Sequence, residues 1–168
     1  FNYKYILNYF FKKKKEIKKF KIDKKFVLGI GNKNNNKILL ISRINKKKKD
    51  IKSFLVDQKL ASGIGNIYAN EILFICRINP KRLAMKLSKL DCKKIIHFSK
   101  KILSSAIKKG GSSIRDFKNI SGTNGNFQNE FKVYQRENLH CLRSKCRGKI
   151  QKIFISKRST FFCNICQK

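Results

Sequence analysis

The stretch CLRSKCRGKIQKIFISKRSTFFCNIC, residues 141–166, decides how the chain folds at its C-terminal end and holds four of its six cysteines. Four residues separate Cys141 from Cys146, two separate Cys163 from Cys166, and sixteen lie between the pairs. Four thiolates in two close pairs suit tetrahedral zinc, so we predict one structural Zn²⁺ bound by these cysteines. Four protein ligands leave no coordination position for water, so the ion is expected to hold the fold and not to catalyse.

The segment between the two cysteine pairs predicts a β-hairpin. Isoleucines recur among its polar residues: Ile150, Ile153 and Ile155. A turn is expected near Ser156–Ser159, which places Arg158 at the tip. So short a hairpin has too little core to fold alone, and metal binding is expected to supply most of its folding free energy. His140 is the alternative to Cys141 as a ligand.

Upstream of the cysteine pairs, apolar residues recur at helical spacing in three segments. The glycines of ASGIGN, residues 61–66, separate the first two helices, and Asn79–Pro80 ends the second. A capping box of Ser88 and Asp91 begins the third helix, and Gly110–Gly111 ends it. We therefore predict a mainly helical domain ahead of the zinc hairpin. The residues expected on its buried stripes are Ile51, Phe54, Leu55, Gln58, Ile67, Ile72, Leu73, Ile75, Ile95, Phe98, Ile102 and Ala106.

The turn between the first two helices is also a candidate anion site. Gly63 and Gly65 allow the chain to turn tightly, and Asn66 begins the next helix with its N–H groups free. A helix N-terminus with an amide side chain attracts phosphate, and Lys59 lies nearby in the sequence. The alternative is that the glycines serve only to turn the chain.

The formal net charge is +33, from 42 basic and 9 acidic residues. Such a charge favours a polyanionic partner and a salt-dependent affinity. The high lysine content has a second explanation, because an A/T-rich genome also enriches a chain in Lys, Ile, Asn and Phe. If that explanation holds, the run Lys46–Lys49 is only a solvated part of the surface. No segment approaches the ~18 apolar residues of a membrane span. We expect a cytoplasmic, nucleoid-associated bacterial protein.

Three further features have simple expected roles. Cys76 and Cys92 stand alone in apolar helical segments and are expected to be small buried hydrophobes. His97 lies one residue off the third helix's buried stripe and is expected to be a structural or surface residue. The basic run of the opening segment follows its apolar part, which is the wrong order for a secretory signal. The chain begins with Phe1 and not with Met, so we expect a fragment of a longer protein.

Four stretches together resemble the formamidopyrimidine-DNA glycosylase family, in the family's own order. They are LVDQKLASGIGNIYANEILFICRINP (55–80), KKGGSSIRDF (108–117), GTNGNFQNEFKVYQRE (122–137) and KRSTFFCNICQK (157–168). The resemblance covers roughly residues 44–168. It implies a helix–two-turns–helix DNA-binding domain over 44–130 and a zinc finger over 131–168, with residues 1–43 as the remnant of an N-terminal, catalytic, β-rich domain.

The resemblance also implies roles for individual residues. Asn66 matches the asparagine of the family's GIGNIYA motif, which contacts the phosphates beside the lesion. Lys47 falls near a DNA-contacting lysine of the family, and Lys59 and Arg115 complete the expected DNA contacts. Arg158 matches the zinc-finger arginine that grips the phosphates flanking the flipped nucleotide and is associated with δ-elimination, which makes it the catalytic candidate.

The implied activity is that of a base-excision-repair glycosylase and AP lyase. Such an enzyme removes oxidised purines from double-stranded DNA and nicks the strand by β,δ-elimination, here as an expected monomer. Residues 112–126 match the loop that closes over the extruded purine.

This chain departs from the family in three places. It does not open on the family's N-terminal proline nucleophile, its first cysteine pair is longer than C-x2-C, and Asn124 and Asn126 replace the usual Pro and Tyr. A non-enzymatic zinc-ribbon nucleic-acid-binding module is the alternative function, and a remnant without activity is the third.

Overall fold

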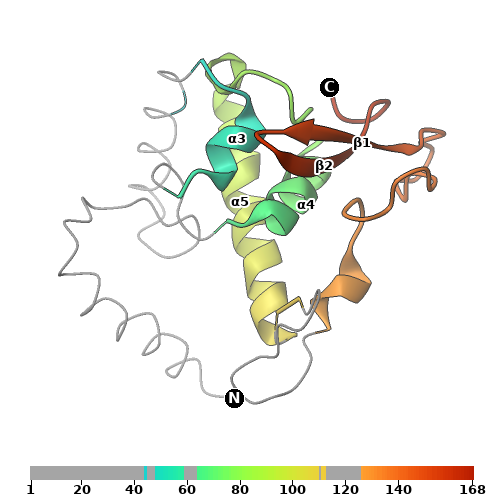
Figure 1. Cartoon of the computed structure of the whole chain (residues 1–168). Helices are drawn as coiled ribbons and strands as arrows, with labels where there is room; N and C mark the ends of the chain where they lie inside the picture. The colour runs from blue at the N-terminus through green and yellow to red at the C-terminus, as the bar shows by residue number, and fades with distance from the viewer. Residues whose placement is uncertain (1–43, 45–47, 59–63, 110, 113–125) are drawn as a thin grey trace, which may run out of the picture.

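The computed structural model describes residues 44, 48–58, 64–109, 111–112 and 126–168. Within these ranges the regular elements, in chain order, are α3 (Ile51–Val56), α4 (Asn66–Cys76), η1 (Ala84–Lys86), α5 (Lys89–Lys108), η2 (Phe127–Glu130), β1 (Ile150–Ile155) and β2 (Arg158–Cys163). Figure 1 shows α4 lying between the long helix α5 and the β1–β2 hairpin. Helices followed by a hairpin with four adjacent cysteines confirm the predicted fold class.

Helix α3 begins as a side-chain-capped turn. The Asp50 carboxylate accepts a hydrogen bond from the Ser53 N–H at 2.7 Å, which satisfies one of the free donors of the first turn. Ile51, Phe54 and Leu55 are fully buried, as their spacing predicted. Gln58 does not extend this stripe, because it lies beyond the end of the helix, where its Nε2 donates to the carbonyl oxygen of Ile64 at 3.0 Å.

Helix α4 begins at Asn66, as predicted, but ends at Cys76, ahead of Asn79–Pro80. The reason is Arg77, which adopts a left-handed conformation with φ of 60°. Its N–H faces the carbonyl oxygens of Leu73 and Phe74, so the last turn is closed before the proline is reached. The predicted Ile72 and Leu73 are buried, whereas Ile67 and Ile75 are half-buried.

Helix α5 has the predicted capping box, in which the Ser88 hydroxyl accepts from the Asp91 N–H and the Asp91 carboxylate accepts from the Ser88 N–H. Ile95, Ile102 and Ala106 are buried against α4, and Phe98 is half-buried. His97 is exposed, with its ring edge-on to Phe98 at 5.0 Å between centroids.

Both isolated cysteines lie in the helical core. Burial raises the pKa of the Cys76 thiol to about 12 and that of the Cys92 thiol to about 11. Each therefore stays protonated near neutral pH and packs as a small apolar side chain, as predicted.

The hairpin is antiparallel, with Ile155 paired to Arg158 at the turn and Ile150 paired to Cys163 at the open end. Ser156 and Lys157 form the turn, with φ of 50° and 59°, the doubly positive pair of a type I′ connection. The turn is therefore shorter than the predicted Ser156–Ser159, and Arg158 is the first residue of β2. Ser-Lys lacks the Asn-Gly signature of such turns, which explains why the sequence misplaced its end.

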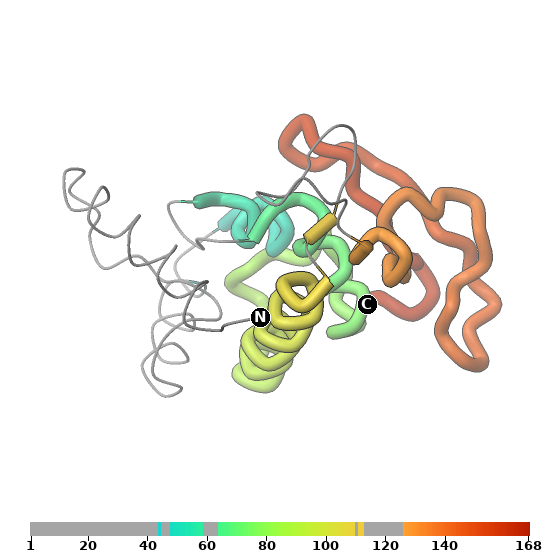
Figure 2. The backbone as a smooth tube through the Cα atoms, turned by 90° about the horizontal axis from the view of Figure 1, so that it is seen from below, coloured from blue at the N-terminus to red at the C-terminus, as the bar shows by residue number. Residues whose placement is uncertain are grey.

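Two apolar clusters hold the fold. The larger joins the three helices, and the smaller lies beneath the hairpin around Phe74, Val133, Ile150 and Phe161. Seen from below, the chain from residue 126 onward lies to one side of α5 (Figure 2). Among the described ranges, no helix combines the length and apolarity needed to cross a bilayer.

Candidate functional site

The four predicted cysteines converge at the open end of the hairpin. Their sulfur atoms all lie within 4.8 Å of one another. The Sγ atoms of Cys141 and Cys166 are 3.8 Å apart, and those of Cys146 and Cys163 are 3.6 Å apart. Four sulfurs around zinc at ~2.3 Å would be separated by roughly 3.8 Å along each tetrahedral edge. The cluster is thus already close to the spacing of a tetrahedral metal site.

The chemistry of the donors also favours a cation. Burial, and then the neighbouring thiols of Cys163 and Cys141, raise the pKa of Cys166 to about 12. Burial opposes ionisation of Cys163 as well, but the backbone N–H groups of Cys166 and Ile165 lower its pKa overall. Thiols this close cannot all ionise without a positive charge among them, and a metal ion supplies that charge. His140 is exposed and paired through its backbone with Lys149, apart from the sulfur cluster.

Gln167 ties the second cysteine turn to the helical domain. Its side chain is 1% exposed, accepts from the Cys163 N–H at 2.9 Å and donates to the carbonyl oxygen of Ile78 at 2.9 Å. The carbonyl oxygen of Lys168 then accepts from the Asn79 N–H at 3.1 Å. The sulfur cluster is therefore fixed against the segment that follows α4.

Two asparagines join the start of α4 to β2. Asn66 Nδ2 donates to the carbonyl oxygen of Ser159 at 3.0 Å. Asn70, one turn later and 1% exposed, donates to the Asn66 carbonyl oxygen at 2.7 Å and accepts from the Phe161 N–H at 2.8 Å. Gly65 caps the helix without a side chain, so no side-chain acceptor covers the first N–H groups of α4. Arg158 is thereby carried beside a helix N-terminus, where an anion is favoured.

A buried lysine lies under the same strand. Lys52 is 1% exposed, and its Nζ donates to Thr160 Oγ1 at 2.7 Å and lies 3.5 Å from the carbonyl oxygens of Arg158 and Ser159. Burial, and then the charge of Arg158, lower the pKa of Lys52 to about 8, while Asp50 partly offsets both. Two cations close enough to repel each other are stabilised when an anion binds between or beside them.

The lowered pKa of Lys52 predicts a pH-dependent stability. The folded chain releases this proton near pH 8, whereas the unfolded chain keeps it up to about 10.5, the ordinary lysine value. The free energy of unfolding of the wild type should therefore rise between pH 8 and 10.5 relative to that of Lys52→Met. Denaturant titrations at a series of pH values would measure this. The exposed control Lys149→Met should follow the wild type, and parallel profiles for wild type and Lys52→Met would contradict the assignment.

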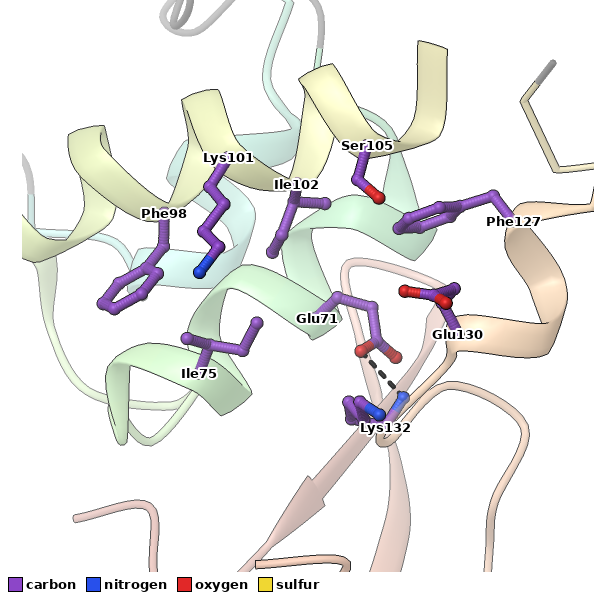
Figure 3. A pocket seen from close by; sticks show the side chains of 9 residues that line it. All are labelled: Glu71, Ile75, Phe98, Lys101, Ile102, Ser105, Phe127, Glu130 and Lys132. Carbon is purple, nitrogen blue, oxygen red and sulfur yellow. Dashed lines mark hydrogen bonds between the residues drawn. The ribbon is translucent and has the colours of Figure 1, made fainter. Parts of the chain in front are cut away.

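Glu71 fixes the segment that enters the zinc-finger region. Its carboxylate, 3% exposed, accepts three backbone N–H bonds, from Lys132 at 2.9 Å, Val133 at 3.0 Å and Tyr134 at 2.9 Å. Burial raises the pKa of Glu71, and these three donors oppose the rise. Figure 3 shows the Glu71 carboxylate directed from α4 toward Lys132; both residues line a hollow, together with Phe127 and residues of α5. The segment 132–134, which follows η2, is thus connected to α4.

The structure brings together only part of the predicted site. Asn66 and Arg158 lie at one edge, and the four cysteines cluster as expected. Lys47, Lys59 and Arg115 lie outside the described residues, as do residues 1–43 and 113–125. Their predicted roles and the predicted domain boundaries remain predictions. Sequence reasoning missed the structural roles of Lys52, Asn70 and Glu71. The sequence feature that could have indicated them is the occurrence of charged or amide side chains inside apolar helical segments.

Comparison with known proteins places this arrangement in a family. The family model of the formamidopyrimidine-DNA glycosylase H2TH domain matches residues 33–118. The formamidopyrimidine-DNA glycosylase of Methylobacterium nodulans is 47% identical over 66 residues, 39% of this chain and 22% of that protein. That of Cereibacter sphaeroides is 40% identical over 86 residues, 51% of this chain and 30% of that protein.

The likeness to solved structures covers a larger share of this chain. The Lactococcus lactis Fpg in complex with DNA containing an abasic site has a TM-score of 0.71 and 37% identity, over 79% of this chain and 48% of that one. The same protein with DNA containing FAPY-dG has a TM-score of 0.70 and 36% identity. The chain thus spans less than a third of these curated relatives and about half of the solved chains. It belongs to the formamidopyrimidine-DNA glycosylase family.

Proposed function

We propose that this chain is the DNA-binding part of a base-excision-repair DNA glycosylase and AP lyase that removes oxidised purines from double-stranded DNA. The observation that carries the proposal is the convergence of Arg158, Asn66 and Lys52 at one edge, with the Lys52 amino group under β2 and the N-terminus of α4 alongside. Relatives that share this architecture have been solved with damaged DNA. Arg158, Asn66 and the free N–H groups of α4 offer charge and donors to adjacent phosphates of one strand, while buried Lys52 supports β2 from beneath and adds its positive charge.

The proposal assigns a structural Zn²⁺ to Cys141, Cys146, Cys163 and Cys166. Zinc bound by four thiolates supplies no open coordination position, so its contribution is to hold the hairpin. The hairpin in turn presents Arg158, which grips the phosphates beside the flipped nucleotide and assists the final elimination. Lys47, Lys59 and Arg115 are proposed as further DNA contacts.

Extrusion of the damaged base costs a few kcal/mol, which contacts to the flanking phosphates can offset. Residues of this chain are proposed to make those phosphate contacts.

The reaction also needs an attacking amine, which in this family is an N-terminal proline. The only proline of the sequence is Pro80, which lies inside the chain after α4. We propose that the nucleophile is supplied by a further part of the full-length protein. Residues 112–126 are proposed to close over the extruded base, anchored at their end by Phe127.

Binding to duplex DNA with a stable abasic-site analogue, compared with undamaged duplex at ~150 mM salt, tests the proposal. We expect the zinc-loaded chain to prefer the lesion duplex and to lose that preference on chelation. Arg158→Ala should weaken lesion binding by roughly 10- to 100-fold, the loss of one or two charge-assisted hydrogen bonds.

Lys149→Ala is the matched control, since this exposed lysine precedes β1 and lies at the end of the hairpin away from Arg158. It should bind the lesion duplex within a few-fold of the wild type. Equal and steeply salt-dependent binding to both duplexes would instead indicate a non-specific nucleic-acid-binding module, and the repair function would have to be abandoned.

A further inference from the structure

The outer face of α5 carries a row of lysines that the lesion site does not use. Lys93, Lys100 and Lys108 recur at intervals of seven and eight residues, which places them on one side of the helix. We call these three residues the α5 stripe; Lys94 and Lys101 flank it, and Figure 3 shows Lys101 reaching from α5 toward the hollow beside Glu71. The opposite side of the helix is buried against α4 through Ile95, Ile102 and Ala106, among others.

The charge of this face is not neutralised within the described part of the chain. Asp91 is the only acidic residue of α5, and it is already engaged by the Ser88 N–H and by Arg82, 3.4 Å away. No ion pair joins a lysine of the stripe to any described carboxylate. Lys109, just beyond the helix, differs, because it pairs with Glu130.

We propose that the α5 stripe binds a second segment of duplex DNA, separate from the segment held at Arg158. Because α4 lies between α5 and the hairpin (Figure 1), the two surfaces face different sides of the molecule. From Lys93 to Lys108 the helix rises about 22 Å. Along the axis of a duplex each strand presents a phosphate every ~3.4 Å, so a stretch of DNA as long as the stripe offers about six phosphates per strand. Each of the three lysines therefore has a phosphate within reach.

Other polyanions fit less well. A helix that lies on an anionic membrane inserts a continuous apolar face, but most apolar side chains of α5 are covered by the helical core, and only Leu90 and Ile107, near its two ends, are exposed. A folded acidic protein would be expected to use a buried aromatic anchor, yet the stripe contains none, and the nearby His97 ring is already stacked edge-on against Phe98. The proposal does not depend on lesion recognition, since it concerns only the phosphate backbone.

A capture experiment on the whole zinc-loaded chain tests the second contact. Lesion duplex is fixed to beads and saturated with protein, and binding of a fluorescent, undamaged duplex is then measured between 50 and 200 mM salt. The triple variant Lys93→Gln, Lys100→Gln, Lys108→Gln keeps helix-forming side chains while it removes three charges. The control Lys86→Gln, Lys149→Gln, Lys168→Gln removes three charges from exposed positions outside α5.

We expect the wild type and the control to capture the second duplex, and the stripe variant to capture it at least ~10-fold more weakly. The slope of log K against log salt for that duplex should fall by about 2.7, which is 0.9 for each lost phosphate contact. Binding to the fixed lesion duplex should be unchanged in all three proteins, with circular dichroism confirming equal helix content.

Three results would overturn the proposal. The first is that the wild type captures no second duplex. The second is that the control loses capture as much as the stripe variant does, which would indicate an effect of net charge alone. The third is that polyglutamate displaces the second duplex better than unlabelled duplex does, which would indicate an acidic protein partner. Failure of the proposed repair function is read separately, from the preference of the wild type for lesion over undamaged duplex on the beads.

Discussion

Cys163→Ser is expected to unfold the hairpin and its two cysteine-bearing turns while α3, α4 and α5 stay folded. Cys163 is 0% exposed and is the last residue of β2, and its Sγ lies 3.6 Å from the Sγ of Cys146. The substitution therefore removes one of the four proposed zinc ligands. Binding of structural zinc to small domains is worth about 10–16 kcal/mol, far more than the small apolar cluster beneath the hairpin can replace. The helices have a larger apolar core of their own, so we expect them to stay folded without the metal.

Metal content and amide hydrogen exchange measure this outcome together. The wild type should bind one zinc per chain and protect the amides of β1 and β2, whereas Cys163→Ser should do neither, and α5 should remain protected in both. Cys92→Ser is the matched control, because it changes a buried cysteine of the helical core outside the sulfur cluster. Full zinc content with a protected hairpin in Cys163→Ser would show that the four cysteines do not form the site.

Local patterns were enough to predict the elements of this fold. The spacing of the cysteines predicted the cluster, because two close pairs joined by a hairpin-length segment leave few other arrangements. The Ser88 and Asp91 pair located the start of α5, since a capping box depends only on neighbouring residues. Two of the errors occurred at ends governed by positive φ in residues other than glycine: Arg77 after α4, and Ser156 with Lys157 in the hairpin turn.

The contacts that assemble the candidate site could not be predicted in this way. Lys52 binds Thr160, 108 residues away, Asn70 binds Phe161, 91 residues away, and Glu71 binds a segment 61 to 63 residues away. No periodicity connects such positions. Lys52 also resembled one more member of the neighbouring lysine run, although it is buried. The one sequence feature that pointed to these contacts was Glu71, one of only nine acidic residues, because it lies in the middle of an apolar helical segment.

Glu71→Ala is expected to destabilise the fold by about 3–5 kcal/mol, a large part of the stability of a domain this size. The change leaves the N–H groups of Lys132, Val133 and Tyr134 without their acceptor, that of Val133 in a buried place and the other two partly buried. Each buried donor without a partner costs about 1–3 kcal/mol. Glu71→Gln should cost less, because the amide oxygen can still accept one or two of these bonds.

The loss should also reach the DNA surface. Tyr134 stacks against Phe161 of β2 at 5.1 Å between ring centroids, so freeing the segment at Lys132–Tyr134 loosens the strand that carries Arg158. Urea titration and lesion-duplex binding, measured on the same samples, should therefore both weaken. The control is Glu137→Ala, whose partly exposed carboxylate pairs with Lys152 at 3.4 Å and should contribute less than about 1 kcal/mol. If Glu71→Ala were no less stable than Glu137→Ala, the three backbone bonds would not be what couples α4 to the zinc-finger segment.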